Sequence, residues 1–131
     1  MYEHMSLRTL VSEWARYLEE RGHVVRRLPN APEVLLSRNR GRRGYRWLLF
    51  HTEQPTRGLT AIEHETLAKQ ARIARKAREK AYLVIKFERP EAKVVVLPAS
   101  RAVKARRLCW DKGGIPWGWQ WQSKERIDED V

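Results

Sequence analysis

Five arginines lie within nine residues in the first half of this chain and form a dense group of positively charged side chains. They are Arg38, Arg40, Arg42, Arg43 and Arg46, with two glycines among them. A guanidinium group presents a planar fork of N–H donors that matches the oxygens of a phosphate. Glycine lets the backbone turn sharply, so such a segment can bring several guanidinium groups to one anion. We interpret this run as a phosphate-contacting turn.

Apolar runs on either side predict that the turn joins two strands. Glu33–Ser37 is expected to be the first strand and Tyr45–Phe50 the second, and both are apolar on both faces, as is typical of central strands. The second run ends in His51-Thr52-Glu53-Gln54. The hairpin can therefore hold phosphates at its tip and present an acidic residue of its open end to a scissile bond.

The charge balance favours a polyanionic partner. The 131 residues include 27 Lys and Arg against 16 Asp and Glu, a formal net charge of +11. Contacts to phosphates release counterions, so this excess favours nucleic acid over an anionic membrane surface. A hydrophobic content of 42% predicts a folded chain with one core.

Several other classes are disfavoured by what the sequence lacks. Cys109 is the single cysteine, so no internal disulfide can form, and the four histidines lack the spacing of a zinc site. No apolar run approaches the roughly 20 residues of a transmembrane helix. The first five residues lack the features of a signal peptide, so we expect a cytoplasmic protein without a membrane partner.

The remaining elements follow from periodicity and caps. Apolar residues at helical spacing predict a first helix from an N-cap at Ser6 to about Arg21, stopped by Gly22. A strand over 23–28 and a turn over 29–32 should follow it, and 54–58 should form a loop. Thr60 and Glu63 have the spacing of a capping box at the start of a second helix.

Strands are then expected over 82–87 and 93–97, and a third, basic helix from Ser100 to about Trp110. The second helix carries a basic stripe on one face, formed by Lys69, Arg72, Lys76 and Lys80. The third carries Arg101, Lys104, Arg106 and Arg107. These helical groups fit a solvated face as well as a phosphate-contacting one.

This order of elements predicts an α/β fold with a mixed central β-sheet flanked by helices. We expect a single domain over residues 1–112 and a tryptophan-rich, partly flexible tail over 113–131. In the tail, Trp117, Trp119 and Trp121 would share one face of a strand.

Several segments together resemble the PD-(D/E)XK nuclease superfamily, and within it the archaeal Holliday junction resolvases. The segments are Leu7-Arg8-Thr9-Leu10-Val11, Arg21-Gly22-His23-Val24-Val25-Arg26, Pro32-Glu33-Val34 and Tyr82 to Phe87. The likeness covers roughly residues 6 to 100. The order and spacing of the four segments carry the resemblance more than any single motif does. It implies a restriction-endonuclease-like core of order αβββαβ.

The resemblance also implies a site, and this chain departs from it. The family holds Mg²⁺ with the Asp of a Pro-Asp motif and the Glu of a Glu-X-Lys triplet, helped by a Glu on the first helix. Here Glu33 takes the place of that Asp, Leu49 the place of the Glu and His51 that of the Lys. The first-helix Glu would fall near Leu7. A lone carboxylate holds Mg²⁺ poorly, because the ion needs several oxygen ligands.

We therefore predict a nuclease-fold protein that binds duplex or branched DNA through the hairpin arginines and basic helices, without cleavage and without a cofactor. The resembled resolvases act as dimers, so a homodimer is expected, with the tail tryptophans packing on the domain or on a second subunit rather than stacking on unpaired bases.

Two alternatives remain open. One is an active Mg²⁺-dependent endonuclease in which Glu33 holds the metal and His51 and Glu53, or Glu63 or Glu65 of the second helix, complete the catalytic site. The other is a subunit that uses its basic face to bind RNA or a protein.

Overall fold

The hairpin predicted from the two apolar runs forms the middle of a mixed sheet in the computed structural model, which describes residues 2–40, 43–89, 92–104, 108–109 and 119–120. The helices are α1 (Tyr2–Glu20), α2 (Ala61–Lys76) and α3 (Ala99–Lys104). The strands are β1 (His23–Leu28), β2 (Ala31–Asn39), β3 (Gly44–Thr52), β4 (Thr56–Arg57), β5 (Lys80–Phe87), β6 (Lys93–Pro98), β7 (Leu108–Cys109) and β8 (Trp119–Gln120).

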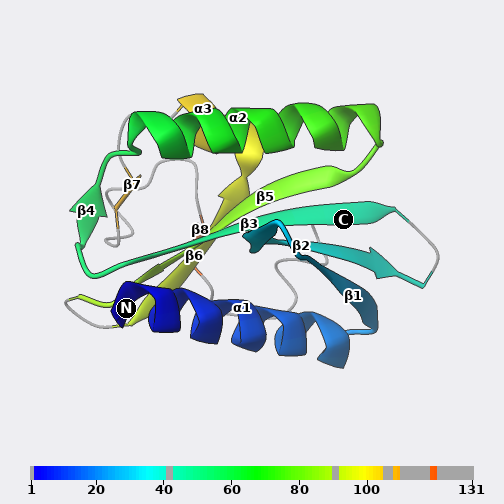
Figure 1. Ribbon diagram of the computed structural model, residues 1–131, viewed down its shortest axis with the longest axis horizontal. Coiled ribbons are helices and arrows are strands. Elements are labelled where there is room, and N and C mark those ends of the chain that lie inside the picture. Colours follow the sequence, from blue (N-terminus) through cyan, green and yellow to red (C-terminus); the bar gives the residue numbers. More distant parts are fainter. Residues whose placement is uncertain (1, 41–42, 90–91, 105–107, 110–118, 121–131) are drawn as a thin grey trace.

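The larger sheet has the strand order β1-β2-β3-β5-β6-β8, and α1 lies on one face with α2 and α3 on the other (Figure 1). β3 and β5 are parallel, and the other neighbours in this sheet are antiparallel. The chain from β3 to β5 runs through α2, since a parallel pair needs a long crossover. The predicted α/β class and mixed sheet are confirmed.

Two apolar cores fill the spaces between the layers. Successive residues of a strand point to opposite faces, so Leu35 packs with Trp14 and Leu18 of α1, while Val34 packs with Leu67 of α2. The expected cover on both sides holds for Trp47–Phe50 of β3, whereas β2 is open on its α2 side at Leu36 and Arg38.

The caps agree with the sequence patterns. Gly22 has φ +93°, the left-handed conformation that ends a helix after its last turn. The hydroxyl of Thr60 accepts from the Glu63 backbone N–H, and the Glu63 carboxylate accepts from the Thr60 backbone N–H, which completes the predicted capping box.

Several boundaries differ from the prediction, among them the end of α2 at Lys76, before Lys80, which begins β5. The first helix begins at Tyr2, because no proline or glycine interrupts the residues before Ser6, and Ser6 therefore lies inside it. Thr56–Arg57, expected in a loop, pairs with Leu108–Cys109. The third helix therefore ends at Lys104, since residues 108–109 take backbone partners in β4; Arg106, Arg107 and Trp110 lie outside the described residues.

Within the described residues, no helix is both long enough and apolar enough to pass through a bilayer. Trp119 and Gln120 pair with Val96 and Val95 of β6. The other two tail tryptophans, Trp117 and Trp121, lie outside the described residues.

A small polar network is buried beneath α1. The Ser37 hydroxyl accepts from the indole N–H of Trp47 at 2.8 Å and lies 3.0 Å from Nδ1 of His23. A neutral imidazole with its proton on Nε2 can accept a hydrogen bond from the Ser37 hydroxyl at Nδ1. Burial of the imidazole, and to a lesser extent the positive charge of Arg21, lowers the pKa of His23 below its ordinary value.

This network predicts a loss of stability in acid. The unfolded chain protonates His23 near the ordinary pKa of about 6.5, whereas the folded chain resists protonation, so the free energy of unfolding falls as the pH drops below that value. Thermal denaturation followed from pH 8 to pH 5 should show this fall in the wild type and a smaller one in His23→Gln. The exposed His64→Gln is the matched control, and equal pH dependence in His23→Gln and the wild type would contradict the assignment.

Candidate functional site

The arginine tip and the polar end of the hairpin lie at opposite ends of its ladder. Arg38 pairs with Gly44 near the tip, and Val34 pairs with Leu48 toward the open end. Glu33 and Arg38 are five residues apart on β2, which corresponds to about 16 Å of strand. A phosphate held at the tip is therefore not one that Glu33 could reach.

The tip presents exposed arginines from both strands. Arg38 is an exposed residue of β2, Arg40 follows the strand in the left-handed region with φ 51°, and Arg43 is exposed just before β3. Arg26 is exposed on the neighbouring strand β1, directly opposite Leu36. Arg42 lies outside the described residues.

Arg46 is placed apart from the other hairpin arginines. It is only 8% exposed, and its Nε and Nη1 donate to Glu79 Oε1 and Gln70 Oε1, each at 2.8 Å. Strand alternation turns Arg46 toward α2, where a charge needs a partner. This guanidinium therefore ties β3 to α2 and to the turn before β5, and does not face solvent.

The basic stripe of α2 is partly as predicted. Lys69, Arg72 and Lys76 are exposed, whereas Lys80 is half-buried in β5. The C-terminal end of α2 and the tip of the β2–β3 hairpin lie at the same end of the molecule (Figure 1). Exposed positive charge from the two elements therefore gathers at this end, remote from Glu33 and His51.

The surroundings of Glu33 do not fit a magnesium ion. Glu33 follows Pro32 near the start of β2, and Leu49, which the resemblance sets at the position of the family's Glu, is fully buried in the core beneath α1. A hollow of about 330 Å³ beside Pro32 is lined by apolar side chains and by Arg8 and Arg27. Within the described residues no group of three His, Cys, Asp or Glu side chains could hold a metal.

The alternative carboxylates are used elsewhere or lie on other surfaces. Glu63 caps α2 and forms an ion pair with Arg57. Glu63 and Glu65 both belong to α2, which packs on the face of the sheet opposite to α1. Glu53 lies in the bend after β3 and is exposed.

His51 belongs to a cluster of charges that the sequence patterns did not indicate. His51 pairs with Lys86 on the parallel strand β5, and its Nε2 lies 3.3 Å from Glu88 Oε2. Lys86 Nζ lies 3.6 Å from Glu13 Oε1 of α1 and 4.0 Å from Glu88 Oε1. One lysine ammonium is thus shared between the two carboxylates of this cluster.

Burial limits what His51 can do. Its side chain is 5% exposed, and neither ring nitrogen has hydrogen-bond geometry with a partner, although Glu88 is within ion-pair distance. A general base must reach the proton that it abstracts, and this imidazole is covered. The feature of the sequence that could have indicated this cluster is Lys86, the one charged residue inside the apolar run Tyr82–Phe87.

Comparison with known proteins gives a structural match. No family model and no curated protein matches the chain. Hjc of Archaeoglobus fulgidus, a Holliday junction resolvase from an archaeal hyperthermophile, is similar in structure, with a TM-score of 0.57 and 20% identity over 84% of this chain and 87% of that one. This chain has the restriction-endonuclease-like fold. The predicted fold relationship is confirmed, and at this identity it is the fold that is shared.

The role of Arg46 can be tested by a double-mutant cycle. Glu79→Ala leaves a buried guanidinium without its carboxylate and should lower the free energy of unfolding by about 3 kcal/mol, the low end for a buried pair because the Glu79 side chain is still 16% exposed. Adding Arg46→Met should restore most of this loss, because no buried charge remains.

Urea denaturation of the two single variants and the double variant measures the coupling. Additive losses in the double variant would show that the two side chains do not stabilise each other in the fold.

Proposed function

We propose that this protein binds DNA, duplex or branched, through the exposed basic residues at the hairpin tip and on α2, and does not cleave it. The observation that carries the proposal is the separation of two features. The exposed arginines gather at one end of the sheet, and the position that the resemblance implies for a metal site lies at the other end, where the described residues offer no group of three His, Cys, Asp or Glu side chains.

The charge and the fold support the same partner. A net charge of +11 favours a polyanion, and Hjc, a structural neighbour of this chain, is a Holliday junction resolvase. Arginine forks at the tip of a hairpin fit phosphate oxygens, which position the backbone without reading its sequence. We therefore infer strong salt dependence and little preference for the sequence of duplex DNA.

The local charges oppose cleavage. Mg²⁺ needs anionic oxygens around it, and Glu33 is accompanied by Leu49 on the neighbouring strand and by Arg8 and Arg27 in the adjoining hollow. The carboxylates of Glu13 and Glu88 are within ion-pair distance of Lys86. This composition of the described residues supports a protein that does not hold the metal that the resemblance implies. The homodimer and the cytoplasmic location remain predictions.

The binding surface can be tested with paired alanine variants. Arg40→Ala/Arg43→Ala should weaken binding to a fluorescent DNA duplex and to a four-way junction by about tenfold, and should reduce the slope of log affinity against log salt by about 2. Arg16→Ala/Arg89→Ala removes the same charge from exposed positions on α1 and after β5. Fluorescence anisotropy at several salt concentrations measures both effects.

An equal loss in the two double variants would mean that net charge, and not the tip, governs binding. No detectable binding at low salt to either DNA would refute the proposal. Tighter binding to RNA of the same sequence, or capture of proteins that survives nuclease treatment, would favour the RNA- or protein-binding alternative.

The absence of cleavage is a separate prediction. Purified protein incubated with junction, duplex and single-stranded DNA and with Mg²⁺ or Mn²⁺ should give no products above the background of a no-protein control, and Glu33→Gln should behave as the wild type does. Cleavage by the wild type that Glu33→Gln abolishes would instead establish the active-nuclease alternative.

A further inference from the structure

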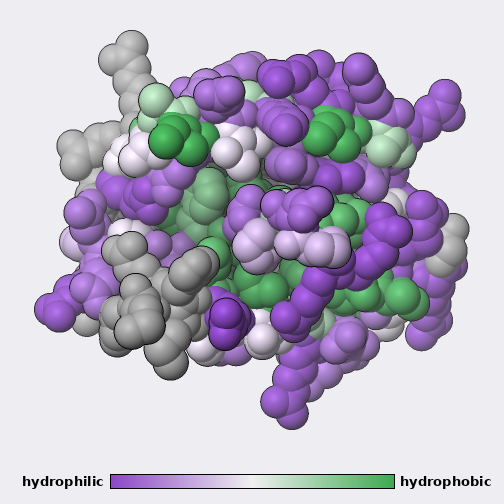
Figure 2. Space-filling model, viewed as in Figure 1, coloured by the Kyte–Doolittle hydropathy of each residue, from purple (hydrophilic) through white to green (hydrophobic). Residues whose placement is uncertain are grey.

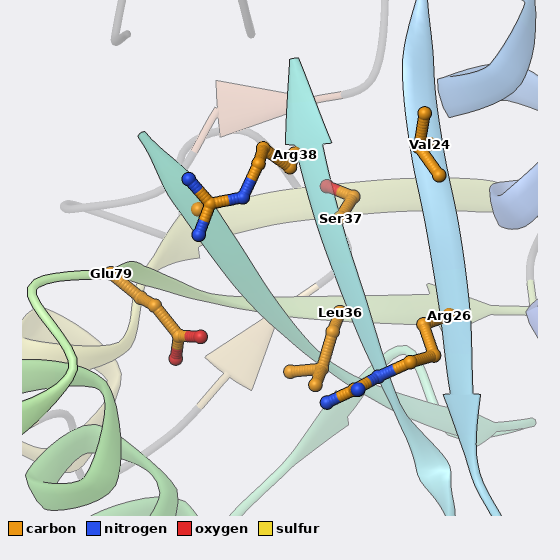
Figure 3. A pocket seen from close by; sticks show the side chains of 7 residues that line it. Val24, Arg26, Leu36, Ser37, Arg38 and Glu79 are labelled. Carbon is orange, nitrogen blue, oxygen red and sulfur yellow. The ribbon is translucent and has the colours of Figure 1, made fainter. Parts of the chain in front are cut away.

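A groove of about 440 Å³ opens on the α2 side of β1 and β2 (Figure 3). It is lined by Val24, Arg26, Leu36, Ser37, Arg38, Gly44 and Glu79. α2 packs over β3 and β5, so it leaves this part of the sheet open. The volume of the groove lies in the range of about 300–1,000 Å³ that is usual for small-molecule sites.

The floor of the groove is apolar and accessible. Val24 is 75% exposed, and Leu36 is half-buried beside it. In the space-filling view, apolar surface lies over the strands beneath α2, and hydrophilic side chains border it (Figure 2). A β-branched residue this exposed on a sheet face offers a flat contact for an apolar ring.

The rim carries charges of both signs. Arg26 extends from β1 past Leu36, and the carboxylate of Glu79 turns toward the same space from the turn before β5 (Figure 3). Arg38 lies on the strand between them. Two guanidinium groups suit an anion, while a carboxylate accepts only from N–H or O–H donors. A purely anionic ligand, such as an acidic peptide, would be repelled by Glu79.

The carboxylate of Glu79 is held in place before any ligand binds. Its Oε1 accepts from Arg46 Nε at 2.8 Å, and Arg46 is fixed in turn by Gln70. Gly44 keeps the groove open at this point. A Cβ there would lie 3.3 Å from Glu79 Cγ and 3.7 Å from both Glu79 Oε2 and Arg38 Nη2. The missing side chain therefore leaves room between Arg38 and the second carboxylate oxygen.

These features together match one chemical class. We propose that the groove binds an unpaired nucleotide whose base carries an exocyclic amino group. The phosphate lies against Arg26 and Arg38, the base ring covers Val24 and Leu36, and the amino group donates to Glu79 Oε2. This inference rests on the proposed nucleic-acid binding and adds to it a preference for single-stranded segments with amino-bearing bases.

The preference can be measured with homopolymers. The probes are fluorescent oligonucleotides of about 12 residues, one of deoxycytidine and one of thymidine, at pH 7.5 and fixed salt. Cytosine presents an amino donor at the position where thymine presents a carbonyl oxygen, so the wild type should bind the cytidine strand about fivefold more tightly. Equal affinity for the two strands would overturn the proposal.

Glu79→Gln provides a sharper test because Arg46 orients the new side chain. Arg46 can only donate, so the amide of the variant should keep its oxygen on Arg46 and turn its NH₂ toward the groove. The preference should then shift from the cytidine strand toward the thymidine strand. An unchanged preference for cytidine in a folded variant would exclude Glu79 as the acceptor.

Two surface variants test the groove without depending on Glu79. Val24→Ser and Arg26→Ala change exposed side chains, so the fold should be retained, as thermal denaturation can verify. Each should weaken binding of the cytidine strand about threefold or more, and Arg16→Ala on α1 is the charge-matched control for Arg26→Ala. No effect of either variant beyond that control would overturn the proposal.

The failures of the two proposals can be distinguished. If binding to duplex and junction DNA persists while the homopolymers bind equally, the groove proposal fails and DNA binding stands. If every DNA fails to bind, both proposals fail. A dimer that Val24→Ser converts to monomer in sedimentation would identify a second copy of this chain as the occupant and overturn the nucleotide assignment.

Discussion

The burial of the β2–β3 hairpin on both faces is the constraint on which the rest of the structure depends. Most residues of β3 and the middle of β2 enter one of two apolar cores, because α1 covers one face of these strands and α2 covers β3 on the other face. A charge that falls in such a place needs a partner, as Arg46 finds in Glu79 and Gln70. A position that is filled by Leu49 at full burial has no room for a metal ligand.

This constraint separates the candidate DNA-binding residues from the position at which a nuclease of this fold would cut. Residues that cannot enter the cores gather at the two ends of the hairpin, with arginines at the tip and His51 at the open end. At the open end, Lys86 lies within ion-pair distance of both Glu13 and Glu88, and the His51 side chain beside them is buried. At the tip the guanidinium groups remain accessible. The proposed function follows from that asymmetry, with the phosphate contacts remote from the position of the nuclease site.

The same packing makes the groove that we propose as a nucleotide site. α2 must lie over β3 and β5 to complete the parallel crossover, and it therefore leaves β1 and the outer part of β2 open. The Arg46–Glu79 pair that stabilises this crossover also fixes a carboxylate at the groove wall. Glu79 is thus both a partner in a structural ion pair and a candidate recognition group.

Local patterns in the sequence determined much of this protein. The apolar runs, the Thr60–Glu63 capping box and Gly22 predicted the elements, because hydrophobic period and capping act over a few residues. Their order indicated the fold that the comparison with Hjc confirms, and the resemblance implied that Leu49 and His51 stand where the family has its Glu and Lys. Only the tertiary structure decided where the charges go. Arg46 is buried and bonded to Glu79, Lys86 of β5 lies beside Glu13 of α1, and Thr56–Arg57 pairs with Leu108–Cys109. Such contacts join residues that are distant in the chain, so they leave no local pattern in the sequence.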